Sequence, residues 1–173
     1  MKRWFISDLH LNHANIIKYC NRPFSCVDEM NAEIIARWNK LINSKDTVYV
    51  VGDVFLGRAD KAQHLVQSLN GNKILIKGNH DKNKDTMIWS GFSQVHNQLT
   101  VNFLDGRRVL LNHKPLENFD SSRWDLLIHG HTHEGPRVNG KFVNVCVDIW
   151  DFYPIEEKDI PQASDSILDA SLR

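Results

Sequence analysis

Short apolar runs that end in polar residues of metal-binding type are the feature that most restricts the fold of this chain. Six runs of strand length are found, at 4–7 (WFIS), 47–51 (TVYVV), 73–76 (KILI), 108–111 (RVLL), 125–128 (DLLI) and 141–147 (KFVNVCV). Several of them are continuously apolar, which is typical of strands that are covered on both faces. We therefore expect buried β-sheets at the centre of the protein.

Amphipathic helical patterns lie between these runs. In 28–42 the residues that share one apolar face are Met30, Ile34, Ile35, Trp38, Leu41 and Ile42. Ser25 and Asp28 resemble a capping box at the start of this helix, and Gly71 is expected to cap a second helix over 60–71. The segment 92–113 is typical of a hairpin that turns at Asp105-Gly106. These patterns predict an α/β or α+β layered fold with mixed sheets packed between helices.

Length and composition predict one ordinary domain. The chain has 173 residues, of which 42% are apolar and 24% charged, and its formal net charge is zero. Neutrality argues against a broad basic surface for long duplex nucleic acid. Residues 1–150 are expected to form the domain. The polar segment 151–173 contains two prolines, and is expected to be a surface-wrapping or partly mobile tail that packs on or extends from the same domain.

The cysteines and the hydropathy pattern bear on location. Cys20, Cys26 and Cys146 are odd in number and lack Cys-x-x-Cys spacing, so we expect reduced thiols in a reducing compartment. No run approaches the eighteen or so apolar residues that span a membrane. The N-terminal MKRWFISD is too short in apolar residues for a signal peptide. A cytoplasmic protein without a membrane partner is expected.

Potential ligands follow five of the apolar runs at once. The groups are DLH after the first run, GD after the second, GNHD after the third, NH after the fourth and HGHTH after the fifth. An aspartate after a strand is by itself most often a turn former. Chance does not readily place six of nine histidines in these groups, with a seventh, His13, three residues past His10, always on the same side of a strand. Because ligands of open α/β sheets bind beyond the carboxyl ends of strands, we expect these groups to meet at one rim.

The HGHTH group places His129, His131 and His133 at every second position. In an extended backbone such residues point to one face, and a metal is the commonest partner of converging imidazoles. Periodicity alone leaves all three histidines open as ligands.

The series DLH, GD, GNHD, NH and GHTH resembles the signature of calcineurin-like metallophosphoesterases, in the same order and rough spacing. The resemblance runs from Asp8 to His133, and FISDLHLNHANIIKYCNRPF is further similar to a small bacterial and phage branch of that family. It implies a four-layer sandwich of two mixed β-sheets flanked by helices. At this length, we expect little room for a domain that encloses a large substrate, and hence an open site.

The resemblance also implies a site for two divalent cations. The first would take Asp8, His10, Asp53 and His133, and the second would take Asp53, Asn79, His113 and His131. The family's closing motif is Gly-His-x-His, so His129 receives a supporting or packing role. The mixed oxygen and nitrogen set suits manganese, which we expect, or iron, zinc or nickel. Two such cations would leave a surplus of about two positive charges over the two aspartates, which attracts phosphate and hydroxide.

The resemblance implies hydrolysis by a hydroxide that bridges both metals, with His80 as a non-ligand catalytic histidine. His80 would steady the developing oxyanion and protonate the leaving oxygen. Asp81 is expected to orient His80. The more distant acid of protein phosphatases, in GDxVDRG, has no counterpart here because the chain reads GDVFLG. This departure weakens the likeness to protein phosphatases.

Substrate contacts are predicted from position and charge. Asn12 and His13 lie just past DLH, where a local turn role is the alternative. Arg22, Arg58 and Lys114 are candidate phosphate clamps, although most surface cations have no such role.

The sequence therefore predicts a metal-dependent phosphodiesterase that acts on a small or nucleotide phosphate ester. A phosphomonoesterase or nucleotide pyrophosphohydrolase is the near alternative, and a nuclease is disfavoured by the neutral charge. A non-catalytic scaffold is the alternative of a different class. It is disfavoured because all seven ligand positions and His80 are present.

Overall fold

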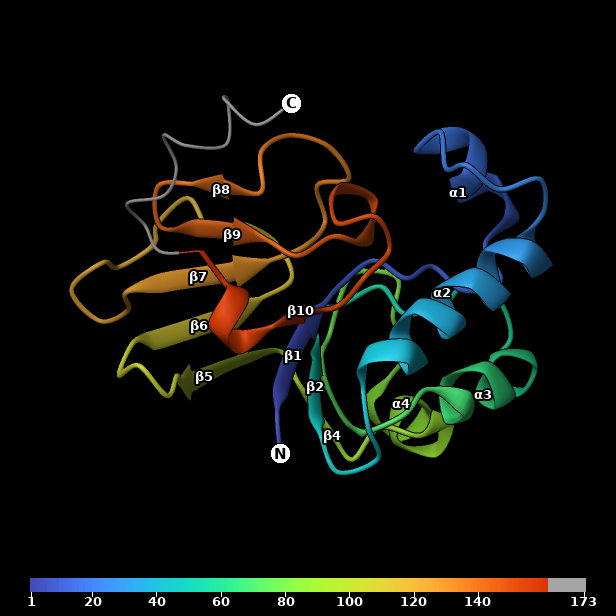
Figure 1. The fold of residues 1–173 in the computed structure, drawn as a ribbon, viewed down its shortest axis with the longest axis horizontal. Helices are drawn as coiled ribbons and strands as arrows, with labels where there is room; N and C mark the ends of the chain where they lie inside the picture. The colour runs from blue at the N-terminus through green and yellow to red at the C-terminus, as the bar shows by residue number, and fades with distance from the viewer. Residues whose placement is uncertain (162–173) are drawn as a thin grey trace.

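The apolar runs form two five-stranded sheets in the computed structural model, which describes residues 1–161 (Figure 1). The first sheet has the order β10-β1-β2-β3-β4. Its strands are β1 (Arg3–Ile6), β2 (Thr47–Val50), β3 (Asn72–Ile76), β4 (Gln94–His96) and β10 (Ile155–Glu156). Strands β1 to β4 run parallel, and β10 pairs antiparallel with β1 at the edge.

The second sheet has the order β5-β6-β7-β9-β8. Its strands are β5 (Gln98–Asn102), β6 (Arg108–Asn112), β7 (Leu126–His129), β8 (Val138–Asn139) and β9 (Phe142–Asn144). The β5–β6 hairpin closes near Gly106, whose φ of 91° suits the predicted turn. The expected hairpin is wrong in its first part, because residues 94–96 form β4 and pair with β3 in the other sheet.

Four α-helices connect the strands of the first sheet and cover its outer face (Figure 1). They are α1 (Ala14–Tyr19), α2 (Val27–Leu41), α3 (Ala59–Ser68) and α4 (Lys84–Ser90). The predicted faces of α2 and α3 are buried through Ile34, Trp38 and Val66, which belong to one core with Ile6 and Leu75. Two 3-10 turns, η1 (Val147–Ile149) and η2 (Glu157–Asp159), follow later in the chain.

Two predicted helix ends are corrected by the structure. The backbone amide and the hydroxyl of Ser25 both pair with Glu29, one residue beyond the expected Asp28. Helix α3 ends at Ser68 with an extended residue after it, so Gly71 is not its cap. Gly71 instead has a φ of 89° in the link to β3, where a Cβ would lie 3.0 Å from the carbonyl oxygen of Asp46.

The inner faces of the two sheets pack on each other. Phe5, Tyr49 and Ile76 of the first sheet share a buried core with Leu111 and Ile128 of the second. Within β1 the side chains alternate, because Ile6 belongs to the core beneath the helices. The predicted pair of mixed sheets with flanking helices is therefore confirmed, with the described α-helices on the first sheet, and continuous apolar runs reflect burial on both faces.

The outer face of the second sheet is covered by irregular chain in the part that the structure describes. The segment 114–125 lies along it, and the Phe119 ring is 5.4 Å from that of Phe142 in β9. Within residues 1–161, all α-helices lie on the side of the first sheet. No helix of this described range has the length and apolar character that a membrane span requires.

The segment after Asp151 is more than a surface tail in its first part. Phe152, Ile155 and Ile160 are buried, and β10 hydrogen-bonds to β1. Burial of these apolar residues agrees with the expected packing on the same domain, and the pairing with β1 makes this part of the segment a strand of the first sheet. Residues 162–173 of the predicted tail lie outside the described residues.

The two sheets meet where their parallel strands end. Ser7, just after β1, forms a parallel bridge with Cys146, which follows β9. The Ser7 amide donates to the carbonyl oxygen of Val145 over 3.0 Å. The carboxyl ends of both sets of strands therefore open onto one shared rim.

Candidate metal centre

The predicted ligands gather at this rim, one group from each strand end. Asp8 and His10 follow β1, Asp53 follows β2, Asn79 follows β3, His113 follows β6, and His131 and His133 follow β7. The two sheets contribute three strands and two strands, respectively. Residues that are 125 positions apart in the sequence thus come within a few ångströms.

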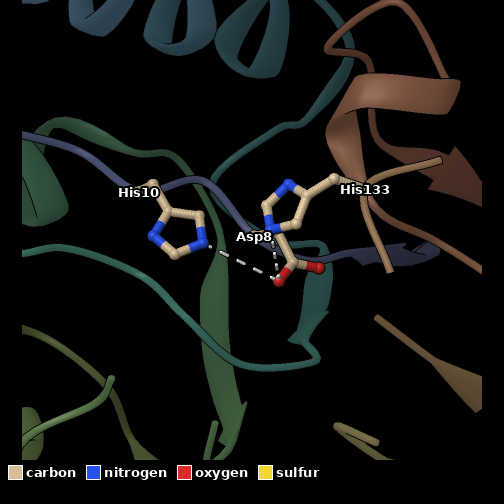
Figure 2. Close-up of side chains that lie close together, drawn as sticks. All are labelled: Asp8, His10 and His133. Carbon is tan, nitrogen blue, oxygen red and sulfur yellow. Dashed lines mark ion pairs between the residues drawn. The ribbon is translucent and has the colours of Figure 1, made fainter. Parts of the chain in front are cut away.

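The first group is centred on Asp8 (Figure 2). His10 Nε2 and His133 Nε2 each lie 3.9 Å from Asp8 Oδ1, and the two rings are 5.2 Å apart. Figure 2 shows both imidazoles turned toward the same carboxylate oxygen. Three ligand atoms of these residues lie within 4.8 Å of one another.

The second group is centred on Asp53. Its Oδ2 lies 3.4 Å from His113 Nε2, and His113 Nε2 lies 3.1 Å from Asn79 Oδ1. The His131 ring is 5.2 Å from that of His113. Asp53 Oδ2 is also 3.7 Å from His10 Nε2 of the first group. This carboxylate therefore stands between the two groups.

Each of the two aspartates has one oxygen held by the protein and one turned to the cluster. Asp8 Oδ2 accepts from the Ser7 hydroxyl at 2.5 Å and the His131 amide at 3.0 Å. Asp53 Oδ1 accepts from the His80 amide at 2.9 Å. This arrangement fixes the carboxylates while it leaves Asp8 Oδ1 and Asp53 Oδ2 facing the imidazoles.

The donors fit a divalent cation. Asp8 Oδ1 and both ring nitrogens of His10 are buried, and none has a hydrogen-bond partner within residues 1–161. Buried polar atoms without partners are costly and rare in proteins. Carboxylate, amide and imidazole donors that converge on one place are the set that a transition-metal ion satisfies.

The surroundings shift the pKa values of three predicted ligands, Asp53, His10 and His113. Burial raises the pKa of Asp53, but the hydrogen bond and charge of His113, with the His80 amide, lower it overall. Burial lowers the pKa of His10, so that the imidazole is neutral. Burial lowers the pKa of His113 too, but Asp53 and Asp8 raise it overall. Metal ligands must be deprotonated, so His113 is the one of these three that binds a proton in competition with a metal.

The backbone at the centre is unusual. Asp8, His10, Asp53 and His131 have positive φ values of 58°, 50°, 56° and 69°. Side-chain-bearing residues rarely adopt this region, and such conformations concentrate at functional sites. The sharp turns at the strand ends aim these side chains into the rim.

Three glycines allow the strand ends to approach closely. A Cβ at Gly130 would collide with Ser7 and the Asp8 carboxylate, and one at Gly78 would collide with Asp53. A Cβ at Gly52 would collide with the His113 ring. These positions explain the glycine before the ligand in GD, GN and GH.

His80 lies beside the cluster without joining it. Its side chain is 46% exposed, and its Nε2 lies 3.9 Å from Asp53 Oδ2. Its ring is 5.5 Å from that of His10. An accessible imidazole at the rim is placed to exchange a proton with a bound molecule.

The expected pairing of Asp81 with His80 is wrong. Asp81 is buried, and its carboxylate accepts from three backbone amides, those of Asp53, Val54 and Gly78, at 2.8 to 2.9 Å. Its oxygens are thus committed to the loops that carry Asp53 and Asn79. Asp81 positions these loops.

The expectation that Arg22 holds a phosphate is also wrong. Its side chain is fully buried, and all five N–H donors have partners in the protein. Two donors bind the carbonyl oxygens of Asp8 and Leu9, and two bind the Asp148 carboxylate. Arg22 therefore fixes the first loop of the centre from behind.

Asp148 is a functional residue that the sequence analysis missed. Its Oδ2 accepts from His133 Nδ1 at 2.7 Å, and it also pairs with Arg22. A carboxylate behind a metal-binding imidazole fixes the ring and its tautomer. The signal was present, because Asp148 follows the apolar run 141–147 as Asp8 follows the first run.

Of the other predicted substrate residues, two pair with neighbouring residues of the protein and two lie beside the predicted ligands. Asn12 is engaged in a turn, where its side-chain oxygen accepts from Asn31 at 2.8 Å and its φ is 62°. Arg58 is exposed and pairs with Asp60. His13 lies at the rim, with its ring 5.5 Å from that of His10. Lys114 is exposed. Burial is the largest cause of the lowered pKa of His131, and the charge of Lys114 lowers it further.

His129 lies outside both ligand groups. It is buried, and its Nδ1 donates to the carbonyl oxygen of Gly130 at 2.9 Å. Its ring is 6.3 Å from that of Phe142, on the outer face of the second sheet.

Known proteins are similar to this chain over most of its length. The family model of calcineurin-like phosphoesterases matches residues 1–124. The uncharacterised protein MJ1445 of Methanocaldococcus jannaschii is 40% identical, over 89% of this chain and 86% of that protein. The Gene 66 protein of Mycobacterium phage L5 is 29% identical, over 85% of this chain and 86% of that protein. A crystal structure of AQ665 from Aquifex aeolicus, of unknown function, superposes with a TM-score of 0.77 and 28% identity, over 92% of this chain and 97% of that one.

Proposed function

Because this chain belongs to the calcineurin-like phosphoesterase family, we propose that it is a metal-dependent phosphodiesterase for a small or nucleotide phosphate ester. Membership of the family suggests metal-dependent phosphoester hydrolysis, and the candidate metal-binding groups agree with it. The observation that carries the proposal is the buried set of unpartnered ligand atoms around Asp8 and His10.

Two divalent cations, manganese by preference, would be held by the two groups that share Asp53. The first group supplies Asp8, His10 and His133, and the second supplies Asn79, His113 and His131. When bound, the cations would lower the pKa of water to give a nucleophile and would offset the charge of the phosphate.

The protein's own groups would carry the remaining work. His80 is exposed at the rim while its amide is tied to Asp53, so the imidazole has a fixed base and an accessible end. It would donate a proton to the leaving oxygen, a step that general acids accelerate substantially. Lys114 and His13, at the edge of the cluster, would contact the phosphate oxygens.

Arg22, Asp81 and Asp148 would keep the ligands in place. The first two hold the loops after β1, β2 and β3 through backbone groups, and the third holds His133 through its ring. Ligands that are fixed before binding lose little conformational freedom when the cation arrives.

Hydrolysis of two chromogenic esters tests the proposal. We expect turnover of bis(p-nitrophenyl) phosphate with added manganese, and slower turnover of p-nitrophenyl phosphate. Iron, zinc and nickel are tested in parallel, and Asp53→Asn serves as the inactive control. A preference for the monoester would favour the phosphomonoesterase or pyrophosphohydrolase alternative. No hydrolysis of either ester with any of these metals would indicate a non-catalytic scaffold.

A further inference from the structure

A pocket of about 540 Å³ lies beside the candidate centre, on the outer side of the second sheet. Its apolar wall includes Pro115, Leu116 and Phe142, and its polar groups include Glu117, His129 and Glu134. This volume lies in the usual range of small-molecule sites, which combine apolar walls with a few polar groups.

The pocket adjoins the part of the centre that contains His113 and His131. Pro115 follows His113 by two residues, and Thr132, which also lines the pocket, follows His131 directly. The side chain of Asn144 donates to the carbonyl and the hydroxyl oxygens of Thr132, at 2.7 and 2.8 Å. Residues that line the pocket are thus close chain neighbours of the predicted ligands, and one of them is held by Asn144.

His129 supplies an acceptor to this pocket. Its Nδ1 must carry the ring proton, because the carbonyl oxygen of Gly130 can only accept. In the neutral ring, Nε2 is then an acceptor, and within residues 1–161 no hydrogen bond to it is found. His129 is only 7% exposed, and what remains accessible of it lies on the pocket. A neutral imidazole that lines a pocket can accept an N–H donor from a molecule bound there.

The charges of the pocket select against phosphate. Glu117 and Glu134 are both exposed acidic residues, and the residues found to line the pocket include no lysine or arginine. Three acceptors, two of them charged, favour a ligand that presents N–H donors. The phosphate of a substrate would therefore lie at the cluster and not in this pocket.

We propose that this pocket binds the planar, amine-bearing base of a nucleotide ester, represented by adenine, while the phosphate of the ester lies at the metal centre. Phe142 and Pro115 offer apolar contacts to such a ring, and acceptors of the pocket lining would receive the two N–H groups of its amine. This inference rests on the proposed function, because it makes the base a part of the substrate.

Binding of a nucleoside without phosphate separates the two proposals. Adenosine is titrated into the full-length ¹⁵N-labelled protein in the presence of a chelator, and amide shifts are followed by NMR. Purine riboside, which lacks only the exocyclic amine, is the matched ligand, and choline represents a non-planar cation. We expect adenosine to shift amides of the segments 115–117, 129–134 and 139–144. Purine riboside should bind about tenfold more weakly, as for the loss of one charge-assisted hydrogen bond.

Variants locate the acceptors. Glu117→Gln and Glu134→Gln should each weaken adenosine binding about tenfold, whereas Glu33→Gln on α2 should leave it unchanged. His129→Phe keeps a ring of similar size and should weaken binding as well. If that buried variant fails to fold, the two exposed glutamates decide the matter.

Three results would overturn the inference. The first is no adenosine binding at about 1 mM. The second is binding of purine riboside or choline as tight as that of adenosine. The third is adenosine binding by both glutamate variants as tight as that by the wild type. Because the chelator removes metals, none of these results depends on hydrolysis. If the protein is active, the glutamate variants should raise KM for an adenosine phosphodiester and leave KM for bis(p-nitrophenyl) phosphate unchanged.

Discussion

His133 Nδ1 lies 2.7 Å from Asp148 Oδ2, so that a carboxylate stands directly behind an imidazole of the candidate centre. Asp148 is itself held by Arg22, whose other donors reach the carbonyl oxygens of Asp8 and Leu9. One buried network therefore connects the first and last motifs of the sequence. Substitutions in this network test how the ligands are positioned, and a substitution of His80 tests the hydrolytic step separately.

Asp148→Asn should weaken metal binding. The amide keeps the shape of the side chain but removes the charge that fixes the His133 ring, and such supporting carboxylates typically contribute about tenfold or more to metal affinity. Calorimetric titration with manganese measures the change. Asp120→Asn, at an exposed acid in the segment 114–125, is the control. Equal affinities of the wild type and Asp148→Asn would show that His133 needs no such support.

Arg22→Met should destabilise the protein. The substitution leaves the Asp148 carboxylate buried without its cation, and the loss of one partner of a buried pair typically costs about 3–5 kcal/mol in the free energy of unfolding. Arg58→Met is the matched control because its pair with Asp60 is exposed to solvent, and it should change little. Urea denaturation of both variants measures this. A stability for Arg22→Met close to that of the control would contradict the structural role of Arg22.

His80→Ala should retain metals and lose turnover. Its side chain is outside both ligand groups, and loss of a general acid typically costs about 10²–10⁴ in rate. Metal analysis is paired with the rate of ester hydrolysis. His113→Ala serves as the contrast, since it should lose metal as well as activity. A wild-type rate in His80→Ala would remove His80 from the mechanism.

Metal affinity should rise with pH near neutrality. Burial is the largest single effect on the pKa of His113 and lowers it, but the hydrogen bond with Asp53 and the charges of Asp8 and Asp53 together raise it. The proton of His113 therefore competes with the cation. As the pH rises through that raised pKa, the proton leaves and the apparent affinity increases. The lowered pKa of Asp53 and that of His10 place their titrations below this range. Calorimetry in buffers of different ionisation enthalpy should detect proton release on metal binding. A flat profile between about pH 6 and pH 8 would contradict this assignment.

The sequence allowed the strands and their ligand-bearing ends to be predicted because both follow from local pattern. Continuous apolar runs gave β1, β2, β3, β6 and β7 nearly to the residue. Short elements carry too little pattern for such a prediction. Helix α1 has one buried residue, Ile16, and β10 has only two residues, so neither shows a readable period.

The supporting residues could not be assigned because their partners are distant in the chain. Arg22 is 126 positions from Asp148, and nothing in NRPF distinguishes a buried arginine from a surface one. The three backbone amides that donate to the Asp81 carboxylate belong to two different loops, so the role of Asp81 depends on how β2 and β3 pair. The collisions that exclude a side chain at Gly52, Gly78 and Gly130 likewise exist only in the folded rim.

The central claim is that seven side chains from five strand ends hold two cations that share Asp53. A crystal structure of the protein soaked in manganese, with anomalous difference maps, tests it most directly. We predict two peaks about 3.5–4 Å apart, one beside Asp8, His10 and His133 and the other beside Asn79, His113 and His131. A map without peaks at this rim, or with manganese bound only elsewhere on the protein, would contradict the account.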